Sequence, residues 1–403
     1  MATSVHELDL PEIEMFGLER REAMTTIEEI RGTSWLARMP LGYSVIDYAD
    51  VQAILRDRRW HSAVSLASAM GMDDMLQRRR EQPSILAMEG PEHARLRRLA
   101  APAFTPKAAD RLRPFMRQVI NDLLDPHTPN GRIELVGDLC DPYPIPIICE
   151  LLGAPKEDWK LFSQWATDIF RIFNSDFEND RDKILKAGEE LDEYVTAMIA
   201  ERRGNLREDL LSDMIAAEEA GDKMSTAELV MMTEAVLMAG TDTTRNQLAC
   251  AVAMFVEHPD QWALLAERPE LASNAVEESM RFLGAVRGTA RIASEDIEYR
   301  EVLFPAGTLV ATSIVGANFD PEVWSDPGRF DITREPSGQP QMTFGSGIHF
   351  CLGANLARAE LQEALPILAR RMPDLGTYAP VEFKPPTVGI WGPSKLPLTF
   401  TPS

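Results

Sequence analysis

The sequence has no long apolar segment. None of its 403 residues lies in a stretch approaching the roughly 20 apolar residues that a membrane-spanning helix needs. Its first residues, Met1 to Asp9, also lack the basic start and apolar run of a secretory signal. These absences predict a cytoplasmic protein that uses no membrane.

Cysteine and positive charge are scarce as well. The four cysteines show no Cys-x-x-Cys pairing and are too few for a disulfide scaffold, so any cysteine chemistry rests on one residue. There are 41 basic residues against 63 acidic ones, and the net charge of −22 argues against nucleic-acid binding, which depends on cations facing phosphates.

The chain also lacks internal repeats, Gly/Ser tracts and Pro-rich linkers that would divide it. Its apolar fraction of 45% is enough for a large buried core. We therefore expect a single domain over residues 1–403.

Most of the chain shows the 3.6-residue periodicity of helices, and only short stretches alternate as strands do. The fold class is therefore mainly α with a minor β-sheet. The clearest helices are expected at Pro91 to Ala103, Lys107 to Leu124, Ala187 to Arg203, Glu270 to Leu283 and Leu352 to Arg371. Strands are expected at Gly42 to Ile46, Ile292 to Tyr299, Thr308 to Thr312 and within Thr387 to Thr401.

One helix is expected to run from Ser225 to about Glu257. Ser225 and Glu228 form the pattern of a capping box, and the length, on the order of 50 Å, would cross the molecule. In its middle stand four consecutive residues of mediocre helix propensity, Thr241 to Thr244, which a purely structural helix has no reason to collect.

The segment Phe344 to Gly353 is the most informative in the chain. Its glycines permit a tight turn in which backbone N–H groups point at the sulfur of Cys351, and Phe344 can shield that sulfur. The helix that follows places its positive end beside a thiolate. Cys140, Cys149 and Cys250 have no such setting, and we expect them to be inert buried residues.

The order Phe-Gly-x-Gly-x-His-x-Cys-x-Gly in this segment resembles the ligand signature of the haem-thiolate monooxygenases, the cytochrome P450 family. The resemblance implies the cytochrome P450 fold, with haem b (iron protoporphyrin IX) between the long central helix and the cysteine loop. Cys351 would be the metal ligand. The cofactor-binding residues implied in this segment are Phe344, Gly345, His349 and Gly353.

Three further motifs of the family occur in order. Glu278 and Arg281 stand at i and i+3 on one helix face, which alone would suggest only a weak surface pair. By resemblance they form a buried structural network with Arg329. The second motif supplies partners for the haem propionates, which need cations or strong donors: by resemblance these are His93 and Arg97, joined by Arg291 and His349.

The third motif lies in the long helix. Val236, Ala239, Gly240 and Thr243 share a face, and a threonine hydroxyl can bond back to the carbonyl four residues earlier and kink the helix. By resemblance, Ala239 and Gly240 adjoin the cofactor, Thr243 hydrogen-bonds dioxygen at the iron, and Asp242 relays protons from bulk water. The catalytic residues are thus Asp242 and Thr243, whereas Thr241 and Thr244 are expected only to pack.

The substrate is the least determined part. The regions at about 60–90 and 159–203 correspond to the variable pocket cover of the family and are rich in apolar residues, which favours a small, largely apolar substrate such as a terpenoid, steroid, fatty acid or aromatic compound. By resemblance, Arg287 occupies a position that often faces substrate and would pair with a carboxylate or another acceptor on it; the alternative is that it points outward. The substrate-pocket residues are expected to be Val236, Val286, Arg287 and Thr289.

The sequence shows no reductase module after Cys351, and we expect the electrons to come from a partner. The resemblance implies an iron–sulfur ferredoxin and its NAD(P)H-dependent reductase serving a monomeric enzyme. A local basic region formed by Arg78, Arg79, Arg80, Arg95 and Arg98 is a hypothetical ferredoxin dock, although a solvated arginine face explains the pattern equally well.

Two alternatives stay open. A peroxide-driven enzyme of the same fold would need no proton relay, and a haem-thiolate sensor would gain nothing from Asp242 and Thr243. A helical protein with accidental motifs would not show four of them in order between His93 and Gly353.

Overall fold

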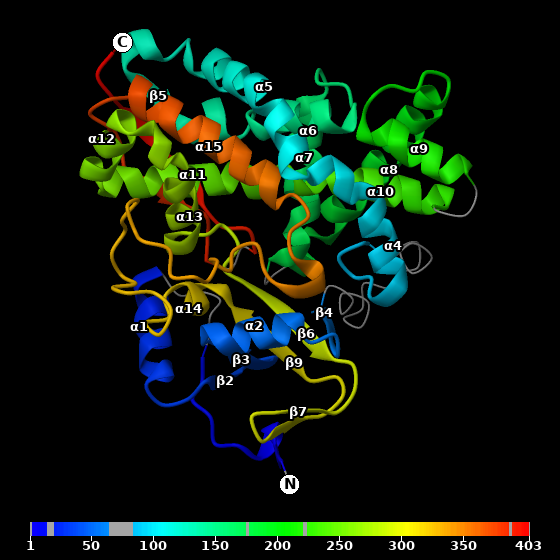
Figure 1. The fold of residues 1–403 in the computed structure, drawn as a ribbon, viewed down its shortest axis with the longest axis vertical. Coiled ribbons are helices and arrows are strands. Elements are labelled where there is room, and N and C mark those ends of the chain that lie inside the picture. The colour runs from blue at the N-terminus through cyan, green and yellow to red at the C-terminus, as the bar shows by residue number, and fades with distance from the viewer. Residues whose placement is uncertain are drawn as a thin grey trace. The chain divides into compact units, whose positions relative to one another are not determined.

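The computed structural model describes residues 2–13, 20–63, 84–174, 177–220, 224–386 and 389–402. Within them the protein is mostly helical with small sheets, which confirms the expected fold class (Figure 1). The chain forms two compact units. Unit 1 comprises residues 1–94, 286–329 and 336–351, and unit 2 comprises residues 95–285, 330–335 and 352–403.

Unit 1 is built on a five-stranded sheet of order β2-β3-β9-β6-β4, in which only β3 and β9 run parallel. β-Branched and aromatic side chains favour these strands. Trp60 and Phe304 meet edge to face in the core beside the sheet, with ring centroids 5.3 Å apart. The strands are β2 (Leu36–Met39), β3 (Gly42–Val45), β4 (Trp60–Ser62), β6 (Gly288–Ala293) and β9 (Leu309–Ser313).

The rest of unit 1 consists of a small sheet of order β1-β8-β7 and a few helices. The expected strand Ile292 to Tyr299 is wrong as a single element, because a turn separates β6 from β7. The remaining elements are β1 (Thr3–Ser4), η1 (Val5–Glu7), α1 (Arg20–Arg31), α2 (Tyr48–Arg56), β7 (Ile297–Tyr299), β8 (Val302–Phe304), α14 (Ile314–Asn318), η9 (Gly347–His349) and the first half of α4 (Gly90–Ala100).

Unit 2 is helical. Along α5, Met116, Ile120 and Leu124 recur every four residues and are fully buried, which gives the helix an apolar face. This helix packs on α15, which also contacts α12 and α13. The principal helices are α5 (Pro106–Leu124), α6 (Pro144–Leu152), α7 (Trp159–Ile169), α8 (Arg181–Arg203), α9 (Leu210–Glu219), α12 (Pro259–Glu267), α13 (Ala272–Phe282) and α15 (Ala354–Arg371).

Short strands and turns complete unit 2. The sheet of order β10-β13-β5 and the pair β11-β12 account for the strand signal in the tail. These elements are β5 (Arg132–Glu134), the π-helical turn η5 (Val136–Cys140), β10 (Gly376–Thr377), β11 (Glu382–Phe383), β12 (Pro393–Lys395) and β13 (Pro397–Thr399). In the described ranges, no helix is both long and apolar enough to cross a membrane.

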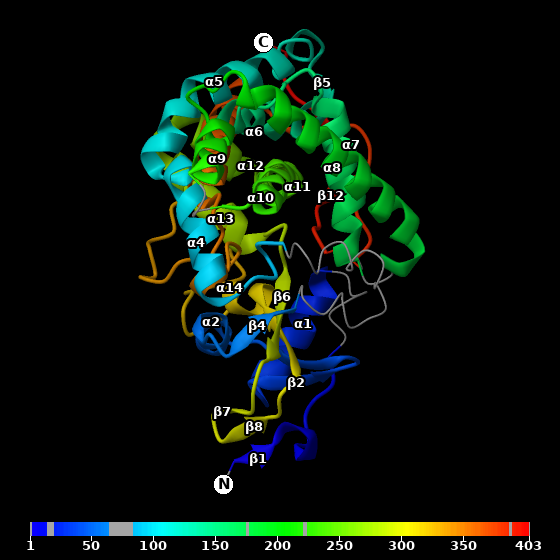
Figure 2. The same cartoon turned by 90° about the vertical axis from the view of Figure 1, so that its right-hand side faces the viewer.

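The expected continuous helix from Ser225 to Glu257 is interrupted. It forms α10 (Thr226–Ala239) and α11 (Asp242–Glu257), and the predicted capping box at Ser225 is present. At the break, the N–H of Thr241 bonds to the carbonyl of Met238, three residues back, so the last turn of α10 tightens. Figure 2 looks along the two helices, which lie in unit 2 among α6, α7, α8 and α12.

Gly240, at this break, is required by close packing. A Cβ atom built on it would lie 2.8 Å from both Cδ1 and Cγ1 of Ile148 in α6. Glycine is therefore needed here for packing, because α10 can approach α6 this closely only where no side chain intervenes. The role predicted for Gly240 beside a cofactor stays a prediction.

Replacing Gly240 with alanine therefore tests the packing of α10 on α6. We expect Gly240→Ala to lower the free energy of unfolding by about 1–3 kcal/mol, because Ile148 or the helix must shift. Urea unfolding of Gly204→Ala is the control, since Gly204 has φ −79° and its nearest neighbour to a built Cβ is 3.7 Å away. Equal effects of the two substitutions would contradict this account.

Candidate functional site

The segment around Cys351 has the backbone that its glycines predict. Gly345 and Gly347 adopt φ values of +71° and +72°, and a Cβ on Gly347 would collide with the carbonyl oxygen of Leu55. The N–H of Cys351 donates to the carbonyl of Phe344 at 2.9 Å. In unit 1, the result is a tight loop that presents Cys351 at the surface beside Phe350, which is 38% exposed.

The other cysteines differ sharply from Cys351. Cys140, Cys149 and Cys250 are buried, as expected, whereas Cys351 is exposed. Burial raises the pKa of Cys140 well above its usual range and raises the pKa of Cys149 to about 12. Among the four cysteines, Cys351 is therefore the candidate for a thiolate that binds a metal.

Unit 1 also brings two of the predicted propionate-binding histidines together. The rings of His93 and His349 lie 4.7 Å apart between centroids, and His93 is buried. Nε2 of His349 is 3.0 Å from Oε1 of Glu89, which also accepts from the N–H of Ser62. Burial raises the pKa of Glu89, but the bonds from His349 and Ser62 outweigh it and hold the pKa below its ordinary value.

Sequence reasoning missed Glu89, whose negative charge also acts on the buried Arg291. The guanidinium of Arg291 is buried, yet it donates hydrogen bonds to neutral groups, the Thr289 hydroxyl and the Ala290 carbonyl. Burial lowers the pKa of Arg291, and the charge of Glu89 opposes that effect. A buried cation so placed fits an anionic group such as a haem propionate.

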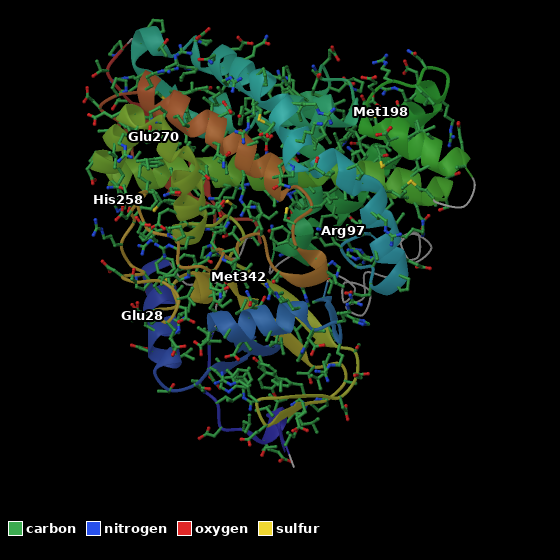
Figure 3. All side chains as sticks on the ribbon, in the orientation of Figure 1. Glu28, Arg97, Met198, His258, Glu270 and Met342 are labelled. Carbon is green, nitrogen blue, oxygen red and sulfur yellow. The ribbon has the colours of Figure 1, made fainter. Side chains whose placement is uncertain are left out.

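Arg97, the fourth predicted propionate ligand, lies in unit 2. It is half-buried in the second half of α4 (Figure 3). Its role stays a prediction, as does that of Gly353, which immediately precedes α15.

The hydroxyl bond predicted in the broken helix is confirmed, and the roles predicted for the face that carries it stay predictions. Ala239 is exposed and Thr243 is partly exposed, although most residues of α10 and α11 are buried, as is Val236. The Thr243 hydroxyl donates to the carbonyl of Ala239 at 2.9 Å, which is the predicted bond four residues back. Thr241 is buried and its hydroxyl bonds to Met238, in keeping with the packing role expected of it.

Asp242 is buried in an ion pair that sequence reasoning missed. Its Oδ1 accepts from Nε of Arg245 at 2.8 Å and also from Nη2. Arg245 is held in turn by the hydroxyls of Ser163, at 3.2 Å, and Thr167, at 2.8 Å. The i, i+3 spacing was visible in the sequence, but nothing in it showed that α7 would supply hydroxyls.

The structural network around Glu278 is present, with a member that was not foreseen. The buried carboxylate accepts from Nε and Nη2 of Arg281, each at 2.8 Å. Arg334 donates to both carboxylate oxygens at 3.1 Å, and the N–H of Asp331 donates at 3.0 Å. The part predicted for Arg329 stays a prediction.

The predicted substrate-pocket residues fall in both units. Val286, Arg287 and Thr289 lie partly buried at the start of β6 in unit 1, while Val236 belongs to unit 2. Of the predicted pocket cover, residues 64–83 and 175–176 lie outside the described residues.

Comparisons with known proteins agree with these features. A profile of the family described as cytochrome P450 matches residues 154–371. Nocardicin C N-oxygenase of Nocardia uniformis subsp. tsuyamanensis is 37% identical over 90% of this chain and 91% of its own. Luteothin monooxygenase of Streptomyces thioluteus is 35% identical over 99% of each chain. The crystal structure of CalO2 superposes with a TM-score of 0.87 at 31% identity, over 95% of this chain and 97% of that one.

The chain belongs to the cytochrome P450 family. It is a monooxygenase of the bacterial type, an oxidoreductase that works with haem, O2 and electrons from a redox partner.

The buried network predicts a large stability effect at Glu278. We expect Glu278→Gln to lower the free energy of unfolding by about 3–5 kcal/mol, since the buried guanidinium of Arg281 and the partly buried one of Arg334 lose the carboxylate that both contact. Chemical denaturation measures the change. The control is Glu270→Gln, labelled in Figure 3, which removes an exposed pair with Arg268 and should leave stability unchanged. A Glu278→Gln variant as stable as the control would contradict the network.

Proposed function

We propose that this monooxygenase holds haem b through the thiolate of Cys351 and inserts one oxygen atom of O2 into a small, largely apolar organic molecule. The observation that carries the proposal is the exposed Cys351 on its positive-φ glycine loop, in the same unit as the buried cation Arg291. The thiolate would bind the iron. His93, His349, Arg291 and Arg97 would receive the propionates, with Glu89 fixing the ring of His349.

A thiolate-ligated haem supplies the chemistry of dioxygen activation, which requires protons. The chain supplies the groups that hold and move them. Asp242 is a buried carboxylate at the start of α11, one residue before Thr243. The Thr243 hydroxyl, now bonded to Ala239, is a hydrogen-bond partner for a ligand at the exposed face of the helix break.

For the electrons we propose an iron–sulfur ferredoxin and its NAD(P)H-dependent reductase. The basic docking site predicted for the ferredoxin is weakened, because the positive charge of Arg95 is paired with Glu228. Arg98 is exposed, while Arg78, Arg79 and Arg80 lie outside the described residues. The cytoplasmic location and the monomeric state stay predictions.

The substrate class is proposed from the apolar side chains of the pocket cover: a terpenoid, steroid, fatty acid or aromatic compound, commonly hydroxylated. The two relatives are named for oxygenation reactions, which supports oxygen insertion. They also argue against the sensor alternative. A peroxide-driven enzyme is less well supported, because it has no use for the buried Asp242 and its held counter-ion.

The role of Cys351 is tested by serine substitution. Because a hydroxyl is a poor substitute for a thiolate on iron, Cys351→Ser should lose the thiolate signature of the ferrous–carbonyl spectrum and all oxygenation. The control, Cys149→Ser, should keep both in the protein that folds, since Cys149 is buried in α6. A thiolate spectrum that survives in Cys351→Ser would overturn the proposal.

Arg287 is tested with a panel of terpenoids, steroids, fatty acids and aromatic acids, by following the ferric spin state of the haem-loaded protein. An acid that pairs with Arg287 should bind roughly tenfold or more tightly than its neutral analogue, equivalent to about 1.4 kcal/mol. Arg287→Ala should remove that preference and leave the binding of neutral compounds unchanged. The same acid preference in both proteins would exclude Arg287 as the anchor.

A further inference from the structure

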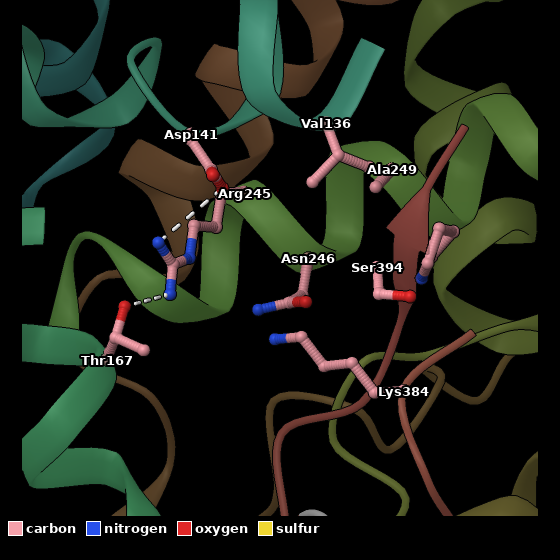
Figure 4. A pocket seen from close by; sticks show the side chains of 9 residues that line it. Val136, Asp141, Thr167, Arg245, Asn246, Ala249, Lys384 and Ser394 are labelled. Atoms are coloured by element: carbon pink, nitrogen blue, oxygen red, sulfur yellow. Dashed lines mark hydrogen bonds and ion pairs between the residues drawn. The ribbon is translucent and has the colours of Figure 1, made fainter. Parts of the chain in front are cut away.

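A pocket that several charged and polar side chains help to line lies beside the Asp242–Arg245 ion pair, entirely within unit 2. Its volume is about 220 Å³, and its lining includes Asp141, Thr167, Arg245, Asn246 and Lys384. Figure 4 shows Arg245 joined to both Asp141 and Thr167, with Lys384 and Asn246 among the side chains that line the pocket. Each water takes up about 30 Å³ in the liquid, so the pocket has room for several.

The side chains of this cluster differ in exposure. Among the pocket-lining residues, Ser394 is exposed and the Asp141 side chain is 36% exposed, whereas that of Arg245 is 8% exposed. Asp242 is not among the lining residues but bonds to Arg245, and its side chain is 5% exposed. The two carboxylates thus differ in access to water but share one counter-ion.

Arg245 is built to serve both carboxylates. Its Nε bonds to Asp242 at 2.8 Å, and its Nη1 lies 3.5 Å from Oδ1 of Asp141. The hydroxyls of Ser163 and Thr167 hold the guanidinium independently of either acid. If a proton moves from Asp141 to Asp242, Arg245 faces one ionised carboxylate before the transfer and one after it. The transfer therefore leaves the net charge of the cluster unchanged, which keeps its electrostatic cost low in a buried site.

We propose that Asp141 is a second proton-carrying carboxylate of this enzyme, which exchanges a proton with Asp242 through the pocket while Arg245 acts as their common counter-ion. The inference rests on the proposed function, in which Asp242 relays protons. In the step, the O–H bond of Asp141 breaks and its proton passes to pocket water. That water gives a proton to the Asp242 carboxylate, where a new O–H bond forms, and bulk water reprotonates Asp141. No electrons move.

The electrostatics of the pocket agree with this role. Burial raises the pKa of Asp141, the positive charges of Arg245 and Lys384 lower it, and Asp242 and Glu134 raise it, with a net rise above 3.8. Burial lowers the pKa of Lys384; Asp242 and Asp141 oppose that effect, and Arg245 adds to it. An acid with a raised pKa keeps its proton closer to neutral pH and can donate it.

The first experiment compares the haem-loaded, full-length wild type with Asp141→Asn. Asparagine keeps the size of the side chain but carries no transferable proton. Product formed per NAD(P)H consumed should fall roughly tenfold, less than the order of 10²–10⁴ typical of a direct general acid, because solvent partly replaces an outer carrier. The solvent deuterium isotope effect should rise. Asp141→Glu should restore much of the loss, and Asp138→Asn, in the same turn but not in the pocket lining, should match the wild type.

A second readout does not depend on activity. The folded-state pKa of Asp141 is raised, so its contribution to stability is fully present below the ordinary value of 3.8 and is lost as pH rises through the folded value. The melting temperature of Asp141→Asn should therefore rise relative to that of the wild type as pH increases. A temperature difference that is independent of pH would contradict a raised pKa and overturn the inference.

Lys384→Met supplies an independent test that can be used if the Asp141→Asn variant folds poorly. Removing the ammonium takes away a charge that favours ionised Asp141, so the alkaline limb of the coupled reaction should shift to higher pH. An active wild type whose coupling and pH profile are unchanged by Asp141→Asn and Lys384→Met would overturn the inference alone. A wild type with neither a thiolate spectrum nor oxygenation would overturn the proposed function and the inference with it.

Discussion

The break between α10 and α11 is the constraint on which the catalytic half of the site depends. Gly240 has no side chain, which lets the chain lie directly against Ile148 of α6. The tightened turn at Thr241 then separates α10 from α11. The break leaves Ala239 exposed and makes its carbonyl an acceptor for Thr243. It also places Asp242 in the first turn of α11, where the positive end of a helix stabilises a carboxylate.

Buried charge is handled in two ways in this protein. The carboxylate of Glu278 is closed off: two guanidiniums and a backbone N–H satisfy it, so it contributes structure. Arg291, by contrast, is buried with hydrogen bonds to neutral groups, and the charge of Glu89 offsets the effect of burial only in part. A group of the first kind needs nothing further, whereas one of the second kind is suited to an anionic ligand. Burial alone therefore does not tell a structural charged residue from a functional one. The charge of the groups that contact the residue makes that distinction.

The residues that sequence reasoning missed share one property. Arg245, Glu89 and Arg334 belong to no signature, and each acquires its role from a partner brought close by folding. Arg245 stands three residues from Asp242, but its anchors Ser163 and Thr167 come from α7, about eighty residues away. Glu89 meets His349 across 260 residues. Spacing along one helix is visible in a sequence, whereas the meeting of two distant elements is not.

The sequence by itself determined the fold class and the tight loop before Cys351, because these depend on local periodicity and on glycines whose backbone need is local. The cytochrome P450 family followed from the resemblance of motifs that lie in order along the chain. The sequence also determined the capping box at Ser225 and the hydroxyl bond of Thr243, which are made within a few residues. Only the tertiary structure decided where the long helix breaks and which groups neutralise Asp242. Those outcomes depend on how closely α6 and α7 pack on α10 and α11, since the same residues in an isolated helix would be solvated by water.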